Sequence, residues 1–126
     1  MNENEISRVV LLSAIEVHRT LGGPGLLESV YEEALEWELA ERGLAVERQK
    51  QVPIVYKDRV LGTPLRLDML LNGLVIVECK ATGDYNPIFE VQTLTYLRLL
   101  DLKLGLVINF GEGLVKDGFH RVVNGL

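Results

Sequence analysis

Three stretches of the chain repeat apolar side chains at the spacing of an amphipathic helix. They cover residues 5–21, 26–42 and 87–101. The first two stretches are followed by glycine, at Gly22-Gly23 and at Gly43, where a left-handed residue can end a helix. The pattern therefore predicts two helices near the N-terminus and a third helix in the second half of the chain.

Between and after these helices, the apolar pattern changes to that of β-strands. The segment 46–52 is polar and is followed by Pro53, which is typical of an edge strand. A short strand at 54–56 is expected to end in a turn at residues 57–59. The other predicted strands cover 66–81 (two strands joined by a turn at Asn72-Gly73), 104–110 and 119–123. The order α-α-β-β-β-β-α-β-β predicts an α/β domain in which one helix connects two parallel strands.

The predicted hairpin at 66–81 is apolar except for three charged side chains, Asp68, Glu78 and Lys80. Strands this apolar are normally buried on both faces, where a charge is costly unless it is paired or binds a metal. Because side chains alternate along a strand, Glu78 and Lys80 share one face and Cys79 lies on the other. These charges make the hairpin the candidate functional site.

Whether Asp68 shares the face of Glu78 depends on the length of the loop. A two-residue loop at Asn72-Gly73 would place Asp68 on the opposite face. A three-residue loop that starts one residue earlier, with Gly73 left-handed, would place Asp68 opposite Ile76 and diagonal to Glu78, within ~7–8 Å. We predict the three-residue loop, because one residue of register decides whether a shared site exists.

Two carboxylates on one face repel each other unless a proton or a cation lies between them. Oxygen ligands suit Mg²⁺ or Mn²⁺, and the backbone carbonyl of Cys79 would add another oxygen. Lys80 would hold or deprotonate a water molecule, or neutralise charge on a phosphoryl group. These parts suit metal-assisted hydrolysis of a phosphodiester. The residues alone leave open a buried salt-bridge cluster, or strand ends at which the charges reach solvent.

Length and composition favour a single domain of residues 1–126, with 48% apolar and 25% charged residues. No apolar run approaches the ~20 residues that span a bilayer. The acidic N-terminus and the single cysteine lead us to expect a cytoplasmic protein. The net charge of −5 argues against a non-specific nucleic-acid coat. Residues 1–41 carry −7 and residues 42–126 carry +2, so the second part would meet an anionic ligand.

Asp68 followed by Glu78-Cys79-Lys80 resembles the D…E-x-K core of the PD-(D/E)XK nuclease superfamily. Gly25-Leu26-Leu27-Glu28-Ser29-Val30-Tyr31 resembles the GxxExxY signature of one family in it. Gln92-Thr93-Leu94-Thr95-Tyr96-Leu97 and Ile108-Asn109-Phe110-Gly111 are similar to further stretches of that family. The four motifs occur in order and span roughly residues 9–123.

The resemblance implies a restriction-endonuclease-like core, which is a mixed central sheet flanked by helices. It implies metal ligation by Asp68 and Glu78, with Glu28 as an additional acid. Lys80 is then the catalytic lysine, and Gln92 is the helix glutamine that faces the site. The roles of Tyr31 and Tyr96 remain open.

The implied activity is that of a Mg²⁺- or Mn²⁺-dependent nuclease acting on DNA or RNA. The competing hypothesis is a catalytically silent nuclease fold that binds a protein or a nucleic acid. A minimal nuclease that cuts two strands needs two sites, which makes a homodimer a further candidate. His18 and His120 are expected to be structural, and Asn109 is expected to form a turn rather than to bind a ligand. Cys79 is not expected to be a nucleophile, because its strand face is apolar.

Overall fold

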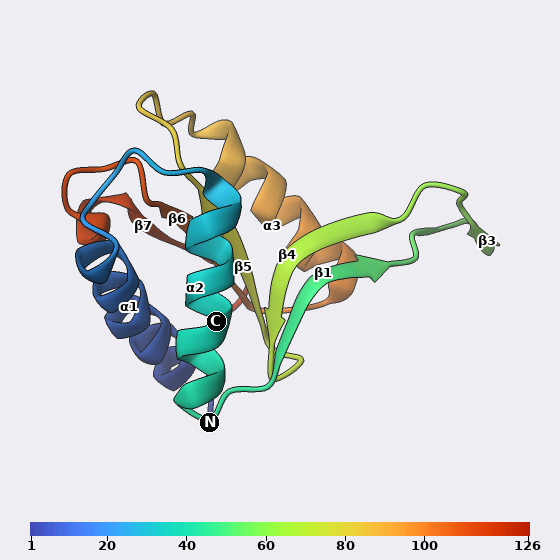
Figure 1. The fold of residues 1–126 in the computed structure, drawn as a ribbon. Coiled ribbons are helices and arrows are strands. Elements are labelled where there is room, and N and C mark those ends of the chain that lie inside the picture. The colour runs from blue at the N-terminus through green and yellow to red at the C-terminus, as the bar shows by residue number, and fades with distance from the viewer.

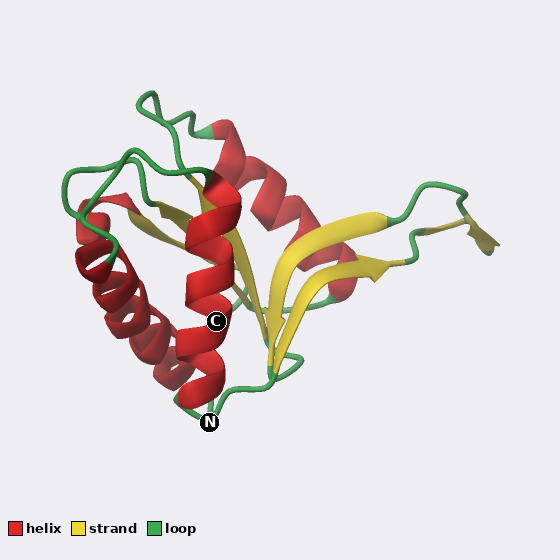
Figure 2. Ribbon diagram, in the orientation of Figure 1, coloured by secondary structure: helices red, strands yellow, loops and turns green.

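The computed structural model describes residues 1–126, in which helices cover both faces of a mixed β-sheet (Figures 1 and 2). The chain folds in the order α1 (Glu3–Thr20), α2 (Glu28–Glu41), β1 (Val46–Val52), β2 (Val55–Tyr56), β3 (Arg59–Val60), β4 (Leu65–Leu71), β5 (Val75–Lys80), α3 (Ile88–Leu100), β6 (Leu104–Asn109), the short 3₁₀ helix η1 (Val115–Gly118) and β7 (Phe119–Val123). The predicted α/β class with a mixed central sheet flanked by helices is confirmed.

The main sheet has five strands in the order β1-β4-β5-β6-β7. Strands β5 and β6 are parallel and α3 connects them, as the sequence predicts, whereas the other neighbours are antiparallel. The polar strand β1 lies at the edge. Strands β5 and β6 are central and buried on both faces, which explains their nearly continuous apolar sequence.

Two hydrophobic clusters lie on opposite faces of this sheet. The larger one packs α1 and α2 against Val75, Val77 and Cys79 of β5. The smaller one packs α3 against Ile76 of the same strand and against β4. Glu78 and Lys80 alternate with the first set, so they lie on the α3 side of the sheet. Gly105 allows α3 to approach β6, because a side chain there would overlap the methyl group of Thr93.

The helix bounds agree with the sequence pattern to within about two residues. Helix α1 begins at Glu3, earlier than expected, because Asn2 and Glu5 form a reciprocal capping box. Helix α3 ends at Leu100, and the next residue, Asp101, caps it in a left-handed conformation with φ 55°. No helix is both long and apolar enough to cross a lipid bilayer.

Strands β2 and β3 form a separate two-stranded ribbon at the end of a projection from β1 and β4, and we call residues 53–64 the arm (Figure 1). Its turn is formed by Lys57 and Asp58, with φ of 48° and 64°. Two successive left-handed residues make a tight two-residue hairpin turn. The predicted turn at 57–59 was therefore one residue too long, because Arg59 already pairs with Tyr56.

Candidate active site

The loop between β4 and β5 contains three residues, as predicted, but it begins one residue later than predicted. Leu71 pairs with Val75, so Asn72, Gly73 and Leu74 form the loop. The loop is held in this position by a contact with the start of β1, in which the Asn72 side chain accepts a hydrogen bond from the backbone N–H of Ala45 at 2.7 Å. The Asn72 N–H in turn donates to the Ala45 carbonyl at 2.9 Å. The loop is thereby tied to the chain that enters β1.

This shift changes the register between the two acids by two positions. Met69 pairs with Val77, and the same register places Asp68 directly opposite Glu78. The prediction that Asp68 lies opposite Ile76 and diagonal to Glu78 was wrong. A shift of two residues leaves each side chain on its original face, so Asp68 and Glu78 still share a face, as predicted.

The two carboxylates are hydrogen-bonded across the opening between the strands. The Asp68 N–H donates to Glu78 Oε2 at 2.9 Å, and the Cys79 N–H donates to Asp68 Oδ2 at 2.8 Å. Each acid therefore accepts from the backbone of the opposite strand, beyond the last regular pair at Met69 and Val77. One oxygen of each carboxylate accepts a backbone hydrogen bond and the other is free of backbone bonds. The two carboxyl groups share a hydrogen bond when one of them is protonated, which adds to the effect of burial in raising the pKa of Glu78 and opposes the effect of burial on the pKa of Asp68.

Burial and mutual repulsion disfavour the ionised forms of these two acids, and we call such a pair strained. Burial raises the pKa of Glu78 to about 8, and the charge of Asp68 adds to the effect. Burial also raises the pKa of Asp68, opposed by the Cys79 N–H and increased by the charge of Glu32. A cation between the free oxygens would relieve both effects. The donor chemistry of this pair therefore fits a divalent metal.

Glu28 reaches the same region from the first residue of α2. The residue is largely exposed, yet burial of its carboxyl group raises its pKa, with Lys80 opposing this shift and Asp68 and Glu32 increasing it. The pKa of Glu28 therefore responds to the charges of Asp68 and Lys80 in the hairpin. No three His, Cys, Asp or Glu side chains converge tightly enough to form a metal cluster by themselves.

Tyr31 positions the chain that leads into Glu28. Its buried hydroxyl donates to the Gly23 carbonyl at 2.7 Å and accepts from the Leu26 N–H at 3.1 Å. Its ring stacks on Phe110, with centroids 4.8 Å apart. The tyrosine of the GxxExxY pattern therefore ties the loop before α2 to the core, a role that the sequence left open.

Lys80 lies two residues after Glu78, on the same face of β5, and is partly exposed. Its Nζ lies 4.5 Å from the centroid of the Phe89 ring on α3, within the range of a cation–π contact. The lysine forms no ion pair within 4.0 Å, so neither Asp68 nor Glu78 neutralises it directly. Its ammonium group remains available to an anionic ligand.

Helix α3 contributes Tyr96 as well as Phe89. Burial raises the pKa of Tyr96, and the charges of Glu78 and Asp68 add to this shift. Gln92 lies one turn earlier on the same helix face, is exposed and forms no hydrogen bond within the protein. Tyr96 is thus the α3 side chain whose charge environment connects it to the acids.

Sequence reasoning missed a buried network that flanks Asp68. Glu32 of α2 is 5% exposed. It accepts from Arg48 Nε and from Gln49 Nε2, both at 2.9 Å. Gln49 is left-handed, with φ 52°, and occupies the position opposite Asp68, where the ladder between β1 and β4 has no regular pair. The available signal was the spacing of four residues from Glu28, which places both acids on one helix face.

Asn109 acts as a clamp at the end of β6. It is fully buried; its Oδ1 accepts from the N–H groups of Thr82 and Gly111, and its Nδ2 donates to the Thr82 carbonyl, each at 3.0 Å. It therefore fixes the backbone two residues after Lys80, and its expected turn-forming role is confirmed. The Cys79 thiol is fully buried and its pKa is raised by burial, which makes it a poor nucleophile.

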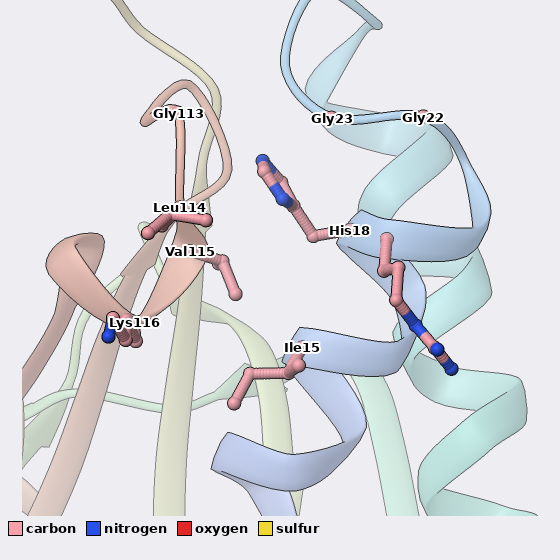
Figure 3. A pocket seen from close by; sticks show the side chains of 9 residues that line it. Ile15, His18, Gly22, Gly23, Gly113, Leu114, Val115 and Lys116 are labelled. Atoms are coloured by element: carbon pink, nitrogen blue, oxygen red, sulfur yellow. The ribbon is translucent and has the colours of Figure 1, made fainter.

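A hollow of about 520 Å³ lies between the end of α1 and the loop before β7 (Figure 3). His18 lines it and lies 3.2 and 3.0 Å from the carbonyl oxygens of Phe110 and Glu112 through Nε2, which gives the histidine the structural role expected for it. None of the lining residues is one of the predicted site residues. The acids lie instead at the open junction of β4, β5 and α3.

Comparison with known proteins gives one match. A family model described as the PD-(D/E)XK nuclease superfamily matches residues 4–122. No curated protein and no solved structure shows a significant match. The match spans all the elements that carry the candidate site.

Proposed function

The chain belongs to the PD-(D/E)XK nuclease superfamily, and from this premise we propose that it is a metal-dependent nuclease that hydrolyses phosphodiester bonds in nucleic acid. The observation that carries the proposal is the pair Asp68 and Glu78. Each holds one carboxylate oxygen in a backbone hydrogen bond and leaves the other free, in surroundings that raise both pKa values.

The free oxygens of Asp68 and Glu78, with the backbone carbonyl of Cys79, would hold Mg²⁺ or Mn²⁺. A site with two carboxylates and remaining water or phosphate ligands is typical of Mg²⁺ in proteins. Glu28 would bind a water molecule of the metal or complete the ligand set. When bound, the metal would polarise the phosphoryl oxygens and lower the pKa of a water molecule.

The remaining side chains would act on the attacking water and on the substrate. Lys80 has no acidic partner, so its ammonium group would orient the water or stabilise the negative charge that develops on the phosphoryl oxygens. In the reaction, the water oxygen bonds to phosphorus and the water loses a proton, the bond from phosphorus to the leaving oxygen breaks, and the leaving oxygen gains a proton. Gln92 would contact substrate from α3, because it is exposed on the helix face that carries Tyr96.

Two narrower assignments belong to the same proposal. The GxxExxY branch of the superfamily is supported by Gly25 at φ 111°, by Glu28 near the acids and by the bonds of Tyr31. A single domain of residues 1–126 is supported by the two hydrophobic clusters, which pack on opposite faces of one sheet.

The test separates metal binding from cleavage. Purified protein is incubated with labelled single-stranded, duplex and branched DNA and RNA, in Mg²⁺, Mn²⁺, Ca²⁺ or EDTA, and metal affinity is measured by calorimetry. Glu78→Gln should lose both metal binding and cleavage. Lys80→Ala should keep metal binding and lose cleavage by at least about 100-fold.

Lys103→Ala is the matched control, because Lys103 is exposed at the other end of the parallel strand pair from Lys80. Absence of cleavage by the wild-type protein across this panel, together with absence of Mn²⁺ binding, would contradict the proposal. That combination would support the catalytically silent fold instead. Metal binding without cleavage of any polymer would reject the nuclease and retain the metal site.

A further inference from the structure

The tip of the arm exposes a cluster of large apolar side chains. Val55 is 61% exposed, Tyr56 57%, Val60 70% and Leu61 42%. The ribbon that carries them projects away from the helices (Figure 1). Apolar clusters of this kind on a protein surface mark sites of interaction with another molecule.

The arm has few internal contacts to support it. Each of its strands has only two residues, and one further backbone bond, from Leu61 N–H to the Ile54 carbonyl at 2.8 Å, continues the ladder. A two-stranded hairpin without a packed face is at best marginally stable in water. The tip would therefore gain stability from a surface that covers its apolar side chains.

A second unpartnered apolar surface lies on α2. Trp37, the single tryptophan of the chain, is 62% exposed. It borders a hollow of about 730 Å³ lined largely by Leu21, Val30, Ala34, Trp37, Ala40 and Val46. An adjoining hollow of about 310 Å³ shares three of these residues. We call this surface the α2 groove, and its volume is sufficient for several side chains.

The charges of the two surfaces are complementary. Helix α2 contains six glutamates and no lysine or arginine. Glu33 lines the groove, is exposed and has no ion-pair partner. At the arm tip, Lys57 and Arg59 flank the single acid Asp58, and neither cation is in an ion pair. Opposite charges at the rim of an apolar contact favour encounter and fix its orientation.

Within one chain the arm does not cover the groove, because both surfaces are exposed in the same structure. Six extended residues span about 20 Å, which sets the reach available to the arm. We propose that the arm tip of one copy docks in the α2 groove of a second copy. A reciprocal exchange makes two such contacts related by a two-fold axis and closes the assembly as a dimer.

The dimer has a consequence for the candidate active site. Strand β4 carries Asp68 and continues directly into the arm, so docking of the tip would hold the strand that supplies one of the two hairpin acids. The inference itself concerns self-association and does not depend on the proposed nuclease activity.

The first test measures mass and tryptophan emission across a dilution series of the full chain. Light scattering after gel filtration and analytical ultracentrifugation should show a dimer that dissociates on dilution. The emission of Trp37 should shift to shorter wavelength in the dimer, because docking removes the ring from water. Val60→Asp in the arm and Glu33→Arg in the groove should each raise the dissociation constant at least tenfold.

The control is Leu99→Asp, an exposed apolar position on α3 that is 51% exposed and outside both surfaces. Arg59→Glu should also weaken the dimer and should be rescued by Glu33→Arg in the same chain. A mixture of Val60→Asp and Glu33→Arg proteins should form a heterodimer more strongly than either alone, because one intact arm can dock in one intact groove. Circular dichroism checks that each variant is folded.

A wild-type protein that stays monomeric up to millimolar concentration would overturn the inference. So would a dimer that tolerates the arm and groove changes as well as it tolerates Leu99→Asp. If the arm variants instead weaken binding of nucleic acid and leave the mass unchanged, the arm is a nucleic-acid contact and the proposal is wrong.

Discussion

The strained pair of acids should make the metal-free protein less stable at alkaline pH than at mildly acidic pH. Glu78 is 8% exposed and lies opposite Asp68, so its folded-state pKa is about 8 against an ordinary 4.5. Between these two values the folded protein binds more protons than the unfolded chain. The stabilisation from the bound proton is therefore complete below pH 4.5, and it is lost as the pH rises through 8.

The difference between the two pKa values sets the upper limit of the effect. Each pKa unit corresponds to about 1.4 kcal/mol, so the free energy of unfolding should fall by at most about 5 kcal/mol across this range. Separation of the strands would admit water and reduce the loss. Even half of this amount would be a large part of the ~5–15 kcal/mol that holds a typical domain.

Urea unfolding followed by circular dichroism, in EDTA at pH 5, 7 and 9, measures this free energy. Glu78→Gln replaces the carboxyl by a neutral amide and should flatten the profile, so that the variant exceeds the wild type at pH 9. Glu47→Gln, an exposed acid paired with Lys50, should leave the profile unchanged. Mg²⁺ should restore wild-type stability at pH 9 and should not affect Glu78→Gln. A flat wild-type profile would refute the argument that the two acids are strained.

Three substitutions test the framework around the site, each by urea unfolding at pH 7. Tyr31→Phe removes a hydroxyl with two hydrogen bonds and should lower the free energy of unfolding by about 1–3 kcal/mol; no loss would show that the loop before α2 is held by other contacts. Asn109→Ala leaves buried backbone groups of Thr82 unpaired and should cost about 3 kcal/mol; a change below about 1 kcal/mol would contradict the clamp. Gly105→Ala should cost about 1–3 kcal/mol by overlap with Thr93, and Thr93→Ser in the same chain should recover part of that loss if the overlap is the cause.

The sequence was sufficient for the order of the helices and of the main-sheet strands because their apolar periods are regular, but it missed the two-residue strand β3 and the short 3₁₀ helix η1. It also placed Asp68 and Glu78 on one face, because an error of two residues in the register does not change the face on which a side chain lies. It did not yield the true register, which depends on hydrogen bonds between Asn72 and Ala45. These residues are 27 positions apart in the chain, and no local pattern reports their contact.

Other features escaped the sequence for a similar reason. The burial of Glu32 was not predicted because its partners, Arg48 and Gln49, come from a strand that follows a turn. Lys80 was expected to act with the acids, and its contact with Phe89 depends on how α3 packs on the sheet. The turn of the arm was predicted one residue too long because a left-handed conformation is uncommon for lysine, and the pattern gave no sign that Lys57 and Asp58 would both adopt it. The first two of these outcomes are decided by tertiary packing, and the third is decided by the local backbone of the turn.

The crossed hydrogen bonds of the acids also provide the molecule with internal reporters. The amide protons of Asp68 and Cys79 point to carboxylate oxygens rather than to carbonyl groups of a neighbouring strand. Their chemical shifts in a nitrogen–proton correlation spectrum will respond to whatever occupies the space between the acids, whether a proton or a metal ion. The occupancy of the site can thus be observed from two backbone signals, without a substrate.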